Sequence, residues 1–150
     1  MSSINIESKI KIISRRKISD NRGWFLKIID GKENSLPNYT GEIYIVSAIS
    51  GESRGGHYHN RAIEWFTLVE GNAVLKLEDI RTNEKKEIYL NDQEPVTVFV
   101  PPHIAHEFIN IDSVPFIVIA YTDQLYKPED TIQYIPVSYT HLTLPTSYGV

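Results

Sequence analysis

Hydrophobic and polar residues alternate along most of this chain, in short runs that turn residues separate. Alternation with a period of two is typical of a β-strand with one buried face, and no long stretch has the period of a helix. The pattern predicts strands over residues 10–18, 24–29, 42–49, 62–69, 74–77, 87–90, 96–100, 108–111 and 116–121. Only residues 128–135 favour a short helical turn. We therefore expect an all-β fold, a sandwich or a barrel.

The chain shows no internal repeat, low-complexity segment or linker, so we assign residues 1–137 to a single domain. Residues 70–72 predict a tight hairpin turn with positive φ at Gly71, after which residues 74–77 would pair back on the preceding strand. Residues 138–150 continue none of the earlier patterns. We interpret them as a non-native or disordered tail and leave His141 out of the site.

Composition excludes some classes of function. The net charge is −4, and no basic run is interleaved with aromatic residues, which argues against a nucleic-acid partner. Cysteine is absent, so no disulfide or thiolate chemistry is available, in agreement with a cytoplasmic location. No apolar run reaches the roughly 18 residues of a membrane span, and the N-terminus lacks the apolar segment of a signal peptide, so we expect no membrane partner.

Two histidines and a carboxylate lie close together in the middle of the chain. His57 and His59 are two residues apart, and on a strand such residues share one face. Glu64 alternates with Phe66 and Leu68, so it points inward if those two side chains do. A buried carboxylate is costly unless it is paired, hydrogen-bonded or bound to a metal. These three residues are therefore a candidate functional site.

A second histidine cluster follows the strand at 96–100. His106 shares a strand face with Phe108, whereas His103 lies in the Pro-Pro turn, so we expect His103 at the surface or at a pocket rim. In a small barrel His106 could join His57, His59 and Glu64 in a site of three nitrogens and one oxygen. Such a site suits zinc, iron, manganese, copper or nickel.

These residues carry a family resemblance. Residues 51–71 resemble the first motif of the cupin family, and residues 101–110 resemble the second. Pro95 and His103 stand where the second motif usually has glycine; both departures concern turn geometry and leave the ligand assignment intact. The resemblance implies a cupin jelly-roll barrel, that is, a double-stranded β-helix in a single domain.

A narrower resemblance is to cupins that act on nucleotide-linked deoxysugars. Residues 20–25 and 77–82 are similar to dTDP-4-dehydrorhamnose 3,5-epimerases, and residues 54–60 to sugar 3,4-ketoisomerases. The resemblance implies an isomerase or epimerase acting on a dTDP- or UDP-linked 4-keto-6-deoxysugar in surface polysaccharide biosynthesis. His57 or His59 would then be the base, Tyr126 the acid, and Arg54 and Arg22 substrate-binding residues.

The metal requirement stays open at this point. The epimerases need no metal and usually lack the second histidine, but His59, Glu64 and His106 are all present here, as in the cupin domain of capsular polysaccharide reductases. We expect one of two cases. Either the site binds a divalent metal, for which zinc is the first choice and iron, manganese or nickel are alternatives, or it binds no metal. A nitrogen that binds a metal cannot also take a proton, so for His57 and for His59 the two roles exclude each other.

Two other functions fit the same residues. One is a metal-dependent cupin of different chemistry, such as a dioxygenase or a phosphosugar isomerase. The other is a non-catalytic sugar-binding cupin that serves a partner enzyme. The apolar outer positions Trp65 and Val69, and the family resemblance, also suggest a homodimer.

Overall fold

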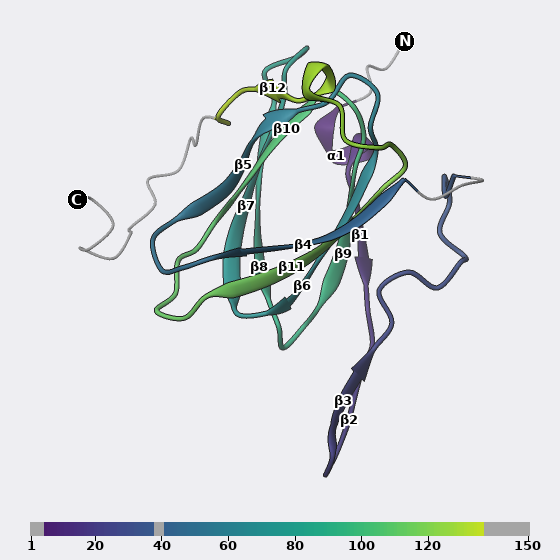
Figure 1. Cartoon of the computed structure of the whole chain (residues 1–150), viewed down its shortest axis with the longest axis vertical. Helices are drawn as coiled ribbons and strands as arrows, with labels where there is room; N and C mark the ends of the chain where they lie inside the picture. Colours follow the sequence, from purple (N-terminus) through teal and green to yellow (C-terminus); the bar gives the residue numbers. More distant parts are fainter. Residues whose placement is uncertain (1–4, 38–40, 137–150) are drawn as a thin grey trace.

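The computed structural model describes residues 5–37 and 41–136, so the expected tail 138–150 and His141 lie outside it. In the described residues, two five-stranded antiparallel sheets face each other (Figure 1). The first sheet has the order β1 (Lys11–Ser14), β9 (Val96–Val100), β6 (Glu64–Glu70), β11 (Phe116–Thr122), β4 (Glu42–Ala48). The second has the order β12 (Ile132–Gln133), β5 (Ser53–Tyr58), β10 (Ile104–Ile109), β7 (Asn72–Asp79), β8 (Lys85–Asn91). The expected all-β, single-domain architecture is confirmed.

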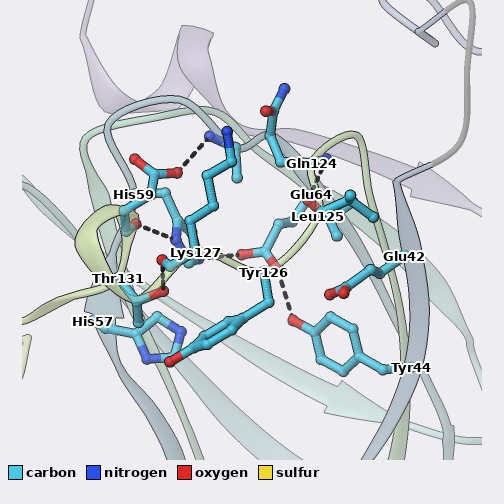
Figure 2. Close-up of a pocket in the computed structure, with 13 residues that line it drawn as sticks. Glu42, Tyr44, His57, His59, Glu64, Gln124, Leu125, Tyr126, Lys127 and Thr131 are labelled. Carbon is cyan, nitrogen blue, oxygen red and sulfur yellow. Dashed lines mark hydrogen bonds and ion pairs between the residues drawn. The ribbon is translucent and has the colours of Figure 1, made fainter.

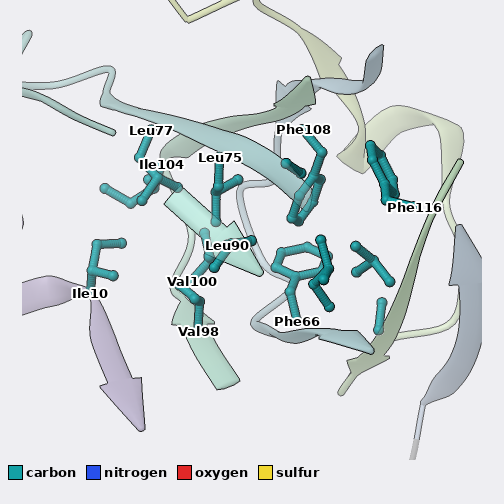
Figure 3. Packing of buried hydrophobic residues seen from close by; sticks show 14 of the residues in the cluster. Ile10, Phe66, Leu75, Leu77, Leu90, Val98, Val100, Ile104, Phe108 and Phe116 are labelled. Carbon is teal, nitrogen blue, oxygen red and sulfur yellow. The ribbon is translucent and has the colours of Figure 1, made fainter. Parts of the chain in front are cut away.

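The core lies between the inner faces of the two sheets. The side chains that fill it include Phe66, Leu75, Leu77, Phe108 and Phe116, all less than 4% exposed (Figure 3). Each such side chain contributes about 1.5–3 kcal/mol when it leaves water. The alternation in the sequence therefore predicted correctly which side chains point inward. Phe66 and Phe108 lie two residues after Glu64 and His106 on the same strands.

The chain crosses between the sheets at Gly71, so the expected hairpin there is wrong. β6 ends at Glu70 and β7 begins at Asn72, but β7 pairs with β10 and β8 in the opposite sheet. Gly71 has a φ of 90°, as expected, and a Cβ on it would lie 2.9 Å from the Cα of Phe116. The glycine is required at this corner because the backbone of β11 passes too close for any side chain.

The first expected strand is divided in the structure. Its residues form β1 and part of β2 (Lys17–Asp20), which pairs with β3 (Gly23–Leu26) in a hairpin that projects away from the sandwich (Figure 1). A four-residue helix, α1 (Ile6–Lys9), precedes β1, and a 3₁₀ turn, η1 (Pro128–Asp130), forms where a helical turn was expected. No helix in the described part of the chain is long and apolar enough to cross a membrane.

Trp65 lies on the outer face of β6 but is only 2% exposed. Its ring stacks on Tyr121, with 5.4 Å between ring centroids, and residues of the segment 28–37 line a cavity beside it. Trp65 is therefore packed within one chain and cannot itself supply the apolar surface for a dimer. Ile43 and Ile45 on the edge strand β4 do present such a surface, at 67% and 69% exposed.

Candidate functional site

The backbone register brings the two histidine clusters together. β5 pairs with β10 so that His57 lies directly opposite His106. A bulge in β5 leaves Gly56 without a partner on β10, and a Cβ on Gly55 would lie 2.7 Å from the carbonyl oxygen of His106. Gly55 therefore allows the close approach of the two strands at the point where each carries a histidine.

Three imidazoles converge at this point. The ring centroids of His57 and His106 lie 4.9 Å apart, those of His57 and His59 5.1 Å, and those of His59 and His106 5.6 Å. One nitrogen from each ring lies within 4.8 Å of the others. The structure thus unites residues that are nearly 50 positions apart in the chain, and His106, rather than His103, completes the cluster.

Glu64 lies against two of these rings. Its Oε1 is 3.0 Å from Nε2 of His59 and 3.2 Å from Nε2 of His106, and the residue is 3% exposed. Its other oxygen, Oε2, accepts a hydrogen bond of 2.6 Å from the hydroxyl of Tyr44. Tyr44 was not singled out from the sequence, although the alternation along residues 42–48 places it on the inner face.

Backbone contacts define the tautomers of two histidines. Nδ1 of His59 lies 2.8 Å from the carbonyl oxygen of Asp130, and Nδ1 of His106 lies 3.0 Å from that of Ile104. A carbonyl oxygen only accepts, so both Nδ1 atoms carry the proton and donate. Each Nε2 is then directed at Glu64 Oε1 with a lone pair unless the ring is cationic.

This arrangement leaves three acceptor atoms facing one another. Nε2 of His59, Nε2 of His106 and Oε1 of Glu64 are the buried side-chain atoms that lack a hydrogen-bond partner among residues 5–37 and 41–136. Three such atoms require a positive charge between them, which either protons on the imidazoles or a divalent cation can supply. The donor set of imidazole nitrogen and carboxylate oxygen fits zinc and similar divalent metals.

The charges of the site follow from the same contacts. Burial acts to raise the pKa of Glu64, but the imidazoles of His106 and His59 beside its Oε1 outweigh it and hold that pKa well below its usual range. Burial acts to lower the pKa of His59, but Glu64 outweighs it and raises that pKa. Burial and the charges of His106 and His59 lower the pKa of His57 to about 4. At neutral pH His57 is therefore neutral and can accept a proton or bind a metal.

A cavity of about 330 Å³ opens beside the cluster (Figure 2). His57, His59, Glu64 and Tyr44 line it together with residues of the segment 123–131. Tyr126, the expected acid, is one of these and is 65% exposed. The cavity thus contains both a proton-accepting histidine and a candidate proton donor.

The expected substrate-binding arginines do not line this cavity. Nε of Arg54 donates to the carbonyl oxygen of Ser47 on β4, and Arg54 is not among the residues that line the cavity. Arg22 is on the projecting hairpin, where it pairs with Asp20, and its side chain is 86% exposed. Their substrate-binding roles stay predictions. His103 lies in the turn as expected, with its Nε2 3.1 Å from Arg81.

The model of the polysaccharide biosynthesis C-terminal domain family matches residues 18–134. The chain belongs to this family. The spore coat polysaccharide biosynthesis protein SpsL of Bacillus subtilis is 25% identical over 125 residues, which cover 80% of this chain and 82% of SpsL. The UDP-2-acetamido-2,6-β-L-arabino-hexul-4-ose reductase of Pseudomonas aeruginosa is 27% identical over 116 residues, which cover 77% of this chain but only 30% of that protein.

Solved structures confirm the cupin fold of this polysaccharide biosynthesis C-terminal domain. A dTDP sugar isomerase from Desulfovibrio desulfuricans superposes with a TM-score of 0.81 at 18% identity, covering 94% of this chain and 95% of that one. A histidine-to-asparagine mutant of the 3,4-ketoisomerase QdtA from Thermoanaerobacterium thermosaccharolyticum, in complex with TDP-4-keto-6-deoxyglucose, superposes with a TM-score of 0.68 at 21% identity, covering 83% of this chain and 86% of that one. The expected resemblance to cupins of the sugar isomerase type is therefore confirmed at the level of fold.

Proposed function

We propose that this chain is a cupin isomerase or epimerase that acts on a dTDP- or UDP-linked 4-keto-6-deoxysugar in surface polysaccharide biosynthesis. The observation that carries the proposal is the cavity that holds neutral His57 beside the Glu64 cluster and is lined by Tyr126. The family match and the relatives SpsL, the dTDP sugar isomerase and QdtA support it.

The residues suit proton transfer next to a carbonyl group. A 4-keto group makes the hydrogen on the neighbouring carbon acidic, and removal of that proton leaves an enolate. His57 takes the proton on its free nitrogen, and the hydroxyl of Tyr126 returns a proton to the sugar. Glu64 raises the pKa of His59, which favours a positive charge on this ring beside the cavity, where it would stabilise the developing enolate.

We also propose that the cluster can hold a divalent metal, with zinc the best fit and iron, manganese or nickel as alternatives. His57, His59, Glu64 and His106 would hold it, and the three unpaired atoms around Glu64 Oε1 support this. When bound, the metal would supply Lewis-acid stabilisation of the enolate oxygen. His57 would then be a ligand, and the base would be a different group in the cavity, such as Glu42.

Deuterium exchange tests the proposal. The protein is incubated with dTDP-4-keto-6-deoxyglucose in deuterated water, and NMR follows the hydrogens at C3 and C5. We expect deuterium at one or both carbons, and a loss of at least about 100-fold in the exchange rate for His57→Asn. His103→Asn is the matched control, because His103 lies outside the cavity and should retain exchange. No exchange at either carbon, with this sugar or its UDP counterpart, would favour a non-catalytic sugar-binding cupin.

Metal content separates the remaining readings. Elemental analysis of purified protein, followed by exchange before and after chelation, assigns the role of His57. If deuterium exchange continues after chelation but is lost in His57→Asn, His57 is the base. Loss of exchange on chelation, together with loss of the bound metal in His57→Asn, identifies His57 as a ligand. A bound redox-active iron without any exchange would favour a metal-dependent cupin of other chemistry, such as a dioxygenase.

We propose a cytoplasmic homodimer as the working form. The exposed apolar residues Ile43 and Ile45 on β4, and Trp24 and Phe25 on the projecting hairpin, support an interface with a second copy. An Arg22 that contacts substrate would have to reach the cavity of that second copy, because its own hairpin projects away from the sandwich (Figure 1). The absence of cysteine agrees with a reducing compartment.

A further inference from the structure

Asp130 is a buried acid that neither the expected mechanism nor the expected metal site uses. It is 8% exposed and lies at the end of the segment that borders the cavity. Its Oδ1 accepts hydrogen bonds from the backbone N–H groups of Asn60 (2.9 Å) and Arg61 (3.1 Å), and its Oδ2 accepts one from Ala62 (3.2 Å). A single carboxylate therefore binds three successive backbone donors of the loop that joins His59 to β6.

A second aspartate continues this pattern at the other end of the same segment. Oδ1 of Asp123 accepts a hydrogen bond of 3.0 Å from the backbone N–H of Ile63. Residues 124–129, which we call the strap, thus run between two aspartates that together bind the four successive N–H groups of residues 60–63. Those four residues connect His59 to Glu64, two members of the candidate cluster.

Asp130 also contacts His59 directly. Its backbone carbonyl oxygen, not its carboxylate, accepts the Nδ1 hydrogen of His59 at 2.8 Å, which Figure 2 marks with a dashed line. This contact fixes the ring orientation and leaves Nε2 directed at Glu64. The contact of Asp123 is with the backbone of Ile63 and involves no side chain of the cluster. The two anchors of the strap therefore differ in one respect, because only Asp130 holds a histidine.

The strap contributes Gln124, Leu125, Tyr126 and Lys127 to the cavity lining. Leu125 and Tyr126 are more than 60% exposed, so little packing holds the strap between its anchors. Hydrogen bonds to a charged acceptor are worth roughly 1.5–3 kcal/mol each, and the loss of the acceptor leaves the N–H donors unpaired. The carboxylate of Asp130 therefore fixes the end of the strap, and the backbone carbonyl of the same residue orients the ring of His59.

We propose that Asp130 is a positioning residue that holds the strap and the ring of His59 as one unit. The hydrogen bonds of Asp130 are sufficient to assign this positioning role. A contribution of the strap and His59 to sugar chemistry rests on the function proposed above. Without the carboxylate, the backbone carbonyl of Asp130 is no longer anchored against His59. Loss of a group that orients a metal-binding histidine through its second nitrogen typically lowers metal affinity by 10- to 100-fold. The strap anchor Asp123 lacks such a contact and provides the comparison.

The test compares Asp130→Ala, Asp130→Asn and Asp123→Ala in the full chain. In metal-free protein, nitrogen-15 NMR of the histidine rings should show the Nδ1–H tautomer of His59 in the parent and in Asp123→Ala. Asp130→Ala keeps the backbone carbonyl but frees it from residues 60–62, so the share of this tautomer should fall in that variant. Zinc affinity, measured by competition with a chromophoric chelator, should fall about 10- to 100-fold in Asp130→Ala and less than threefold in Asp123→Ala. Asp130→Asn keeps one acceptor oxygen, so its zinc affinity should lie between those of Asp130→Ala and Asp123→Ala.

In the deuterium-exchange assay, Asp123→Ala should mainly raise KM, because it loosens the strap, whereas Asp130→Ala should raise KM and lower kcat. A folded Asp130→Ala that keeps both the Nδ1–H tautomer and the zinc affinity of the parent would overturn the proposal. If Asp130→Ala does not fold, Asp130→Asn decides, and unchanged zinc affinity in that variant has the same meaning. The NMR result needs no substrate, so it stands even if no sugar is turned over.

Discussion

The hydroxyl of Tyr44 is the second partner of the buried Glu64, and only the structure reveals it. One oxygen of this carboxylate faces two imidazoles, and the other depends on Tyr44 for its hydrogen bond. The contact leaves Oε1 directed at the histidines. The proton of Tyr44 is held firmly, because burial and the charge of Glu64 raise its pKa above the usual range of a tyrosine.

Replacement of Tyr44 by phenylalanine removes this hydrogen bond and retains the ring. We expect Tyr44→Phe to lower the free energy of unfolding by about 1–3 kcal/mol, because a buried carboxylate oxygen loses its donor. Urea denaturation of metal-free protein measures the change. Tyr89→Phe, on an exposed tyrosine of β8, should change it by less than about 0.5 kcal/mol. Equal stabilities for parent and Tyr44→Phe would show that water satisfies Glu64 instead.

His103 occupies a left-handed backbone position, with a φ of 69°. A non-glycine residue costs roughly 1–2 kcal/mol there, whereas glycine costs about 0.5–1 kcal/mol through the unfolded state. We therefore expect His103→Gly to stabilise the fold by up to about 1 kcal/mol, since the hydrogen bond that the ring makes within the described part of the chain is an exposed contact with Arg81. Thermal unfolding checks this. A loss of more than 1 kcal/mol would mean that the Arg81 contact outweighs the backbone strain.

An ion pair fastens the segment 27–37 to the outer face of the first sheet. Arg15 and Glu33 pair with side chains that are 7% and 2% exposed, and Arg15 also donates to Thr97 on β9 at 2.8 Å. Burial acts to raise the pKa of Glu33, but backbone N–H donors, including that of Asp30, and the Arg15 guanidinium outweigh it and lower the pKa to about 2.

The stability from Glu33 should therefore depend on pH in a defined direction. The folded-state pKa is below the unfolded value of 4.5, so the contribution is fully present above pH 4.5 and is lost as the pH falls toward 2. We expect Glu33→Gln to cost about 2 kcal/mol at pH 7 and progressively less between pH 4.5 and 2. Urea denaturation across this pH range measures the loss in the free energy of unfolding. Glu129→Gln, at an exposed position, is the control and should show little change at any pH. A cost that does not change with pH would contradict the assignment.

The edge strand β4 and the projecting hairpin leave apolar side chains uncovered in the single chain. Ile43 and Ile45 lie on the outward face of β4, and each is about two-thirds exposed. An exposed apolar strand at a sheet edge is a surface that proteins normally cover. A second copy of the chain is the partner that we propose for it.

We expect the parent to be a dimer by light scattering and Ile45→Lys to dissociate it, because a buried lysine without a partner is costly. The dissociation constant should rise at least tenfold. Tyr89→Lys is a matched control, since Tyr89 is 64% exposed on β8 in the other sheet, and it should leave the dimer intact. A monomeric parent, or a dimer insensitive to Ile45→Lys, would refute this interface.

Local pattern was sufficient for the fold class and for the members of the cluster. A period of two assigns each strand residue to a face, so the spacing of His57 and His59, and the alternation of Glu64 with Phe66 and of His106 with Phe108, predicted which side chains point inward. The two motifs carried the resemblance to sugar-modifying cupins. Gly71 was likewise predicted to have positive φ, because its neighbours are turn residues.

Contacts across the chain were beyond the reach of the sequence. Periodicity assigns a face but not a partner strand, so it could not show that β7 leaves β6 for the other sheet, or that residues 17–26 form a hairpin away from the cavity. Asp130 lies about 70 positions from the N–H groups that it binds, and no local signal marks it. Chain topology and packing decide such pairs, because a hydrogen bond depends on distance in space and not on separation in sequence.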